Sequence, residues 1–200
     1  MILKREFYER DTLTVAKELL GKLLVHETKE GTTIGRIVET KRMRDQRIRH
    51  RMLTTISAQR GRKFSMDPLG GHAYVYQIYG IYLCFDVTSG RLVGKPEATL
   101  VRALEPIDGL GVMMRRRGVS NGHIANLTAG PGKLCVAMGI SKKQNGVDLC
   151  VPPLRIETGA TVDKRPIIQT TRVNVDYADE WKRLPRRFFM KDNDFVSRTN

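Results

Sequence analysis

The segment Gly70–Gly90, GGHAYVYQIYGIYLCFDVTSG, is the part of the sequence that most clearly predicts the fold. Tyr, Val, Ile and Phe dominate it, and these β-branched and aromatic residues favour strands. We therefore predict a pair of strands, Ala73–Tyr79 and Ile81–Thr88, which ends at Ser89-Gly90.

Strand and helix signals lie on both sides of this pair. Upstream, apolar and polar residues alternate in Leu23–Glu27 and Thr33–Glu39. With the turn Lys29-Glu30-Gly31 between them, these segments predict a second hairpin. A helix capped by Asp11 is expected before it. The downstream expectations are a strand over Ala98–Leu104, a helix from Asp108 into Arg115-Arg116-Arg117, a helix begun by Pro131 and stopped by Gly139, and late strands at Leu154–Glu157, Arg172–Val175 and Arg187–Met190. There is no internal repeat and no linker, so we predict one α+β domain over residues 1–200.

Composition limits the class of protein. The chain has 200 residues, 40% of them hydrophobic, which suits one globular core. No apolar run approaches the roughly 20 residues of a membrane helix, and the charged N-terminus lacks a secretory signal, so we expect no membrane partner. Cys84, Cys135 and Cys150 have no metal-ligand spacing and are expected to be free or buried thiols in a cytoplasmic protein, associated with the nucleoid if it is bacterial.

The net charge of +14, from 35 Lys and Arg against 21 Asp and Glu, favours a nucleic-acid partner. A generally basic protein without such a partner is the alternative. Much of the charge is local, because Lys41–Lys63 holds nine basic residues and one acid, Asp45, a net of +8.

The segment Lys41–Ser65 has no sustained period of 2 or 3.6 and no aromatic residue before Phe64. Directly after a good strand, it is expected to be a solvated basic loop or an arm that orders on DNA.

Several stretches, taken in order along the chain, resemble the alkyladenine (3-methyladenine) DNA glycosylase family. They are Leu19–Glu27 (LLGKLLVHE), Gly35–Thr40 (GRIVET), Gly70–Gly90, Leu100–Pro106 (LVRALEP), Leu127–Ile140 (LTAGPGKLCVAMGI), Thr171–Met190 (TRVNVDYADEWKRLPRRFFM) and Phe195–Arg198 (FVSR). The resemblance implies a curved antiparallel β-sheet with surrounding short helices. It also implies a monomer without metal or cofactor, which flips a damaged purine out of double-stranded DNA and hydrolyses its N-glycosidic bond.

The resemblance assigns four residues to DNA. Tyr76 would lie in the flipped-base pocket, and Tyr79 would insert into the minor groove. Arg102 would position the flipped nucleotide, and Lys133 would contact phosphate at a helix start. The alternatives are core tyrosines, a surface salt bridge for Arg102 and a plain helix-start turn at Lys133.

Asp86 departs from the family pattern, which has Asn against the base pocket. In the family the amide hinders the exocyclic amino group of normal guanine, whereas an ionised carboxylate can only accept hydrogen bonds and could receive that group. Purine selectivity is therefore expected to differ at this position.

The positions that the resemblance assigns to catalysis also depart from the family pattern. By resemblance, a water-activating Glu, a stacking Tyr and a stacking His should stand where this chain has Lys41, Met43 and, near enough, Met52. An ammonium group cannot accept a proton from water, so Lys41 is not expected to act as the general base.

The genetic code suggests a cause. A shifted reading frame can be built from Thr40 onward by joining the last base of each codon to the first two bases of the next. With suitable synonymous codons, this frame spells Glu-Ala-Tyr-Ala-Gly-Pro-Glu-Asp-Gln-Ala-Ser-His-Ala-Tyr-Asn. The two frames rejoin near Pro68-Leu69. We hypothesise that residues 41–67 are an aberrant segment between two compensating frameshifts. A native basic insert is the alternative.

These observations leave three functions to compare. The first is base-excision repair of alkylated purines such as 3-methyladenine. The second is a catalytically dead protein that still binds lesions or DNA. The third, a basic RNA- or ribosome-associated protein, fits the ordered motifs least.

Overall fold

Two long strands, β2 (Gly31–Met43) and β5 (Glu97–Asp108), pair along most of their length in the computed structural model. The structure describes residues 1–43, 70–90, 97–120, 124–159, 165–171 and 186–197. In the first half of β2, buried residues alternate with partly exposed ones. The four successive residues from Ile37 to Thr40 are all buried. This change of pattern fits a strand that enters the centre of a sheet.

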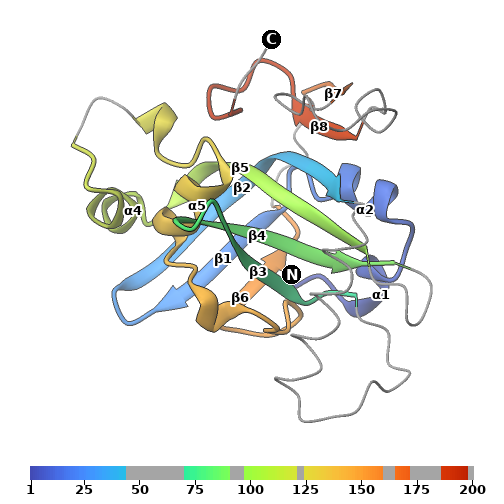
Figure 1. Cartoon of the computed structure of the whole chain (residues 1–200), viewed down its shortest axis with the longest axis horizontal. Helices are drawn as coiled ribbons and strands as arrows, with labels where there is room; N and C mark the ends of the chain where they lie inside the picture. The colour runs from blue at the N-terminus through green and yellow to red at the C-terminus, as the bar shows by residue number, and fades with distance from the viewer. Residues whose placement is uncertain (44–69, 91–96, 121–123, 160–164, 172–185, 198–200) are drawn as a thin grey trace.

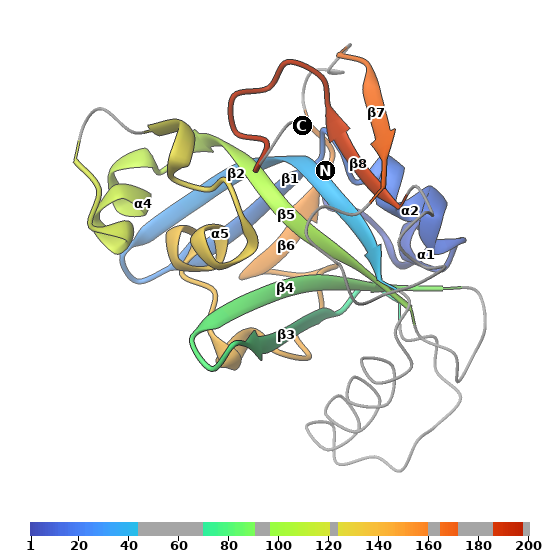
Figure 2. The same ribbon diagram turned by 45° about the horizontal axis from the view of Figure 1, so that its top comes forward.

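The sheet follows the order β3-β4-β5-β2-β1-β6, and its neighbouring strands all pair antiparallel within the described residues. β1 pairs with one edge of β2 as far as Arg36. β8 pairs with the same edge further along, from Glu39 to Lys41. The sheet curls into a half-barrel, with β7 and β8 at one end (Figures 1 and 2). The other strands are β1 (Leu23–Thr28), β3 (Ala73–Ile78), β4 (Tyr82–Ser89), β6 (Leu154–Glu157), β7 (Ile167–Thr170) and β8 (Arg187–Met190).

Short helices lie around the sheet, α1 and α2 near one end of β2 and β5, and α4 and α5 near the other (Figure 1). They are α1 (Arg5–Tyr8), α2 (Thr12–Glu18), α4 (Leu110–Arg117) and α5 (Pro131–Met138), with 3₁₀ turns at Ile124–Asn126 and Lys142–Gln144. Asp11 caps α2 by accepting from the amides of Leu13 (2.9 Å) and Thr14 (3.2 Å). Pro131 opens α5 and left-handed Gly139 ends it.

The main core lies on the face of the sheet that carries Val38, Val75, Phe85 and Val101. Side chains from α2 and α5 complete it, so the helices cover this face. Tyr74 and Ala98 belong to a second, smaller apolar cluster. Because successive residues of a strand point to opposite faces, that cluster marks the other face of the sheet.

The predicted α+β fold with a curved antiparallel sheet is confirmed, as are both hairpins, the α2 cap and the α5 boundaries. α1 and β7 were not predicted. The strand expected at Arg172–Val175 lies outside the described residues, as do Met52 and most of the segment 41–67.

Three boundaries were wrong. β2 does not end at Glu39, because Lys41, Arg42 and Met43 continue the ladder opposite Leu100, Thr99 and Ala98. Arg42 is held there by Glu97, with 2.8 Å between Nη2 and Oε2.

The other two boundaries concern β5 and α4. β5 runs through Glu105-Pro106 to Asp108, because Pro106 sits opposite Gly35 at an irregularity in the ladder. The cap of α4 is Gly109 rather than Asp108, and the Asp108 carboxylate accepts from the Gly109 amide (2.7 Å).

Gly109 offers a test of this packing. It has a φ of +73°, and a Cβ there would lie 2.3 Å from the Thr32 carbonyl oxygen. Gly109→Ala should therefore lower the free energy of unfolding by about 2 kcal/mol or more in chemical denaturation. Gly111→Ala, in α4 with open space around the added methyl, should be neutral or slightly stabilising. Equal effects of the two variants would contradict the packing described.

Candidate active site

The sheet register brings predicted site residues from separate strands onto one face. Asp86 on β4 lies opposite Tyr74 on β3 and Leu100 on β5, and Leu100 lies opposite Lys41 on β2. Residues directly opposite one another in antiparallel strands project on the same side. Asp86 and Lys41 therefore share the face that is turned away from the main core.

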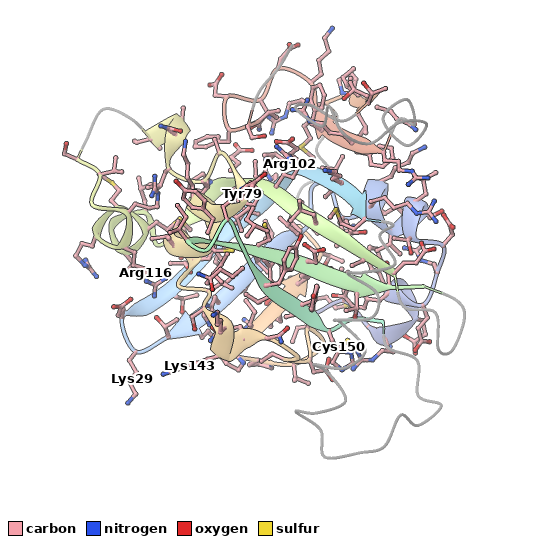
Figure 3. The ribbon with its side chains drawn as sticks, in the orientation of Figure 1. Lys29, Tyr79, Arg102, Arg116, Lys143 and Cys150 are labelled. Carbon is pink, nitrogen blue, oxygen red and sulfur yellow. The ribbon has the colours of Figure 1, made fainter. Side chains whose placement is uncertain are left out.

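The remaining base-pocket candidates join them by the same alternation. Tyr76 is two residues from Tyr74, and Met43 is two residues from Lys41 and opposite Ala98. Met43 and Tyr76 pack against the buried pair Tyr74 and Ala98. Arg102, two residues beyond Leu100, lies at the end of this face nearest β8, and Figure 3 labels it on β5.

The tyrosines form a stacked pair. The ring centroids of Tyr74 and Tyr76 are 5.0 Å apart, with 23° between their planes. Tyr74 is buried, whereas Tyr76 is half-buried. Burial raises the pKa of the Tyr76 phenol, and Asp86 and Cys84 raise it further, so the phenol stays protonated and can donate.

Asp86 is the most unusual polar residue of this face. It is fully buried, and within the described part of the chain neither carboxylate oxygen accepts a hydrogen bond. Burial raises the pKa of Asp86 to about 8, although the charge of Lys41 opposes the shift. The carboxyl is thus held in an environment that disfavours its charge.

Lys41 is half-buried on β2 between β5 and β8, where its backbone pairs with Leu100 and Arg187. Burial raises the pKa values of both Asp86 and Cys84, and the charge of Lys41, on the same face of the sheet, opposes both shifts. An ammonium group at this place can attract a carboxylate or phosphate but cannot activate water as a base.

Glu39 was missed as a site residue. It is fully buried, and its Oε1 accepts from Arg102 Nε (2.8 Å) and Arg187 Nε (2.7 Å), while Oε2 accepts from the Ser197 amide (2.8 Å). Burial raises the pKa of Glu39, but Arg102, Ser197 and Arg187 outweigh it, so the net pKa is lowered. The motif GRIVET contains this residue, yet nothing in its spacing indicated partners so far along the chain.

Arg102 thus pairs with a fully buried carboxylate, which differs from the surface salt bridge that was the alternative to a nucleotide contact. It also donates from Nη2 to the Ser197 hydroxyl (3.3 Å). Its side chain is still 24% exposed, and a guanidinium has five N–H groups, more than these two bonds use. The ion pair orients Arg102 without closing it off from a ligand.

The β3–β4 hairpin ends in an exposed apolar tip. Tyr79 is 84% exposed with a φ of +51°, and Ile81 and Tyr82 are 70% and 52% exposed. Figure 3 shows Tyr79 at the end of the hairpin nearest α5. The core alternative for Tyr79 is excluded by this exposure.

Lys133, in the first turn of α5, is half-buried and donates from Nζ to Asn126 Oδ1. Burial lowers the pKa of Lys133, and the charge of Arg117 adds to this. The helix start lies against the hairpin, because a Cβ on Gly132 would be 2.9 Å from Tyr82 Cδ1. The predicted phosphate contact is thus next to the predicted groove-inserting tip.

The described residues contain no group of three His, Cys, Asp or Glu side chains arranged to hold a metal ion. All three cysteines are free thiols. In the same part of the chain, no helix is long and apolar enough to cross a bilayer.

Comparison with known proteins identifies the family of this chain. The family model described as methylpurine-DNA glycosylase (MPG) matches residues 6–194. The chain belongs to this family. It is 44% identical to a Clostridium acetobutylicum protein over 204 residues, with 98% of each chain covered. A Methanoculleus marisnigri protein is 45% identical over 202 residues, with 99% of this chain and all of the relative covered.

An Alkaliphilus oremlandii relative is 42% identical, with 99% of this chain and all of the relative covered. All three relatives are provisionally named 3-methyladenine DNA glycosylase. The family resemblance seen in the sequence is confirmed, and the family is one of DNA glycosylases, hydrolases of the N-glycosidic bond.

The Glu39 network should be a large contributor to stability. Glu39→Gln removes the charge that pairs with Arg102 and Arg187, and should lower the free energy of unfolding by about 3 kcal/mol. Glu18→Gln, which loses the exposed pair with Arg10 (2.7 Å), should cost at most about 1 kcal/mol. Urea denaturation at pH 7 gives both values, and similar losses would contradict a special role for Glu39.

Asp86 should make stability depend on pH. Between the unfolded pKa of about 3.9 and the folded pKa of about 8, the folded protein retains a proton that the unfolded chain releases. The free energy of unfolding contributed by this group therefore falls as pH rises through that window and levels off above it. Asp86→Asn should raise the melting temperature more at pH 8 than at pH 5. A constant difference across this range would show that Asp86 titrates normally.

Proposed function

We propose that this chain recognises alkylated purines in double-stranded DNA, with the flipped base on the sheet face that holds Tyr76, Asp86 and Arg102. The observation that carries the proposal is the register, which places Tyr76 and Asp86 on one face together with Arg102, two residues beyond Leu100 on β5. The exposed Tyr79 at the end of the same hairpin supports it, because flipping requires a side chain to fill the gap.

The DNA partner follows from charge as well as from family. A net charge of +14 favours binding to a phosphate backbone through counterion release. Lys133 and the exposed hairpin tip lie close together, which suits one contact to phosphate and one to the groove. We expect the protein to act as a monomer in the cytoplasm, near the nucleoid in a bacterium.

A second candidate, a lesion-binding protein without catalysis, is favoured by Lys41. Hydrolysis of the glycosidic bond needs a base that activates water, and an ammonium group has no lone pair for that proton. Glu39 does not replace it, since its pKa is lowered and both of its oxygens already accept hydrogen bonds. We therefore propose that recognition is retained while the chemical step is missing in this chain.

The chain as it stands should release methylated purine slowly or not at all. General-base catalysis contributes on the order of a hundred- to ten-thousandfold, so restoring the other reading frame over residues 41–67 should raise release by at least that range. Abasic sites formed in alkylated DNA provide the measurement. Fast release by the unaltered chain would contradict the missing base.

Fast release would still leave the role of Lys41 open, and borohydride trapping resolves it. An amine that attacks the sugar carbon forms a Schiff base that borohydride reduces to a stable adduct. We expect no trapped complex with the unaltered chain. A trapped complex that Lys41→Met abolishes would show a bifunctional enzyme instead.

Tyr79 should matter for DNA and not for folding. Tyr79→Ala should weaken binding to a lesion duplex by about tenfold, because the gap left by a flipped base loses its stacking partner. Its melting temperature should hardly change, given the exposure of the ring. Tyr74→Ala is the matched control, and the loss of its buried, stacked ring should lower the melting temperature. A large fall for Tyr79→Ala would contradict the assignment.

A further inference from the structure

Asp86 is a buried polar group whose hydrogen-bonding capacity is unused. Both of its carboxylate oxygens are shielded from water, and neither has a hydrogen-bond partner among the described residues. Leaving such atoms unsatisfied is costly, so it needs an explanation in a folded protein. A ligand that supplies the missing donors is one such explanation.

The surroundings of Asp86 suit a flat ligand. Tyr74, directly opposite on β3, stacks on Tyr76, and Leu100 is directly opposite on β5. Met43 and Tyr76 pack over the buried members of this cluster and are themselves only half-buried. The neighbours of Asp86 on this face are therefore apolar and aromatic, which suits a flat ring.

Two unused acceptors side by side favour one hydrogen-bonding edge. Guanine presents two adjacent donors, N1–H and the 2-amino group, which one carboxylate can receive together. Adenine presents a donor next to an acceptor, and hypoxanthine lacks the 2-amino group. Burial raises the pKa of Asp86 to about 8, so the carboxyl is mostly ionised at pH 8.5. The charge of Lys41 favours the ionised form, and two donors from a ligand would favour it further.

We propose that Asp86 determines specificity by accepting two hydrogen bonds from the flipped base, so that this chain prefers guanine-type lesions with a 2-amino group. The inference rests on the proposed function, since it requires a flipped purine on this face. It adds the substrate class that the shared sheet face alone does not specify.

The test compares two bases that differ in one group. The full-length chain is titrated, at pH 8.5, into labelled duplexes with a single guanine·thymine or hypoxanthine·thymine pair, and fluorescence anisotropy gives each Kd. A fully paired duplex is the reference. The chain should bind the guanine duplex about tenfold or more tightly than the hypoxanthine duplex, because one buried hydrogen bond to a charged group separates them.

Two variants at one position control for the duplexes themselves. Asp86→Leu has a similar volume and no acceptor, so its preference for guanine should disappear. Asp86→Asn has one acceptor and one donor, and its preference should be reduced. If Asp86→Leu fails to fold by circular dichroism, Asp86→Asn alone carries the comparison.

Equal affinities of the unaltered chain for the two mismatched duplexes, both above the fully paired duplex, would overturn the inference and leave the proposed function standing. A preference unchanged in the folded variants would also overturn it. Failure to bind either mismatched duplex more tightly than the paired one would defeat the proposed function, and the inference with it.

Discussion

The buried carboxylate of Glu39 joins the parts of the molecule that the site depends on. It pairs with Arg102 on β5 and Arg187 on β8, and it accepts from the amide of Ser197 near the C-terminus. These partners are 63, 148 and 158 residues away in sequence. A fully buried carboxylate is tolerated only when such partners surround it, so the network fixes β2, β5 and β8 relative to one another.

That fixed arrangement separates two tasks on one face of the sheet. We propose that recognition belongs to β3, β4 and β5, whose residues Tyr76, Asp86 and Arg102 share this face. Water activation would belong to β2, at the position that Lys41 occupies. Because the two sets stand on different strands, the second can be lost while the first remains in place. Such a scaffold is suited to binding damaged DNA without hydrolysing the N-glycosidic bond.

Local sequence signals predicted most of the fold. The aromatic and β-branched run around Tyr76 predicted its hairpin, and Asp11 and Pro131 marked helix starts through known cap chemistry. The sequence did not predict a strand over Lys41–Met43, because two of the three residues are basic. Their pairing with β5 and β8 and the ion pair of Arg42 with Glu97 are contacts to distant parts of the chain. The partners of Glu39 and the burial of Asp86 arise from long-range pairing, which no local pattern encodes. The site role of each residue came from family resemblance and stays a prediction.

Base unstacking in lesion-containing DNA tests the central claim, retained recognition without the chemical step, most directly. A 2-aminopurine placed beside a single hypoxanthine or alkylated purine fluoresces more strongly when its neighbour leaves the stack. Adding the unaltered chain should raise this fluorescence for the lesion duplex and not for the fully paired one, while abasic sites fail to accumulate in the same sample. No fluorescence change at saturating protein, or an increase accompanied by rapid abasic-site formation, would contradict the account.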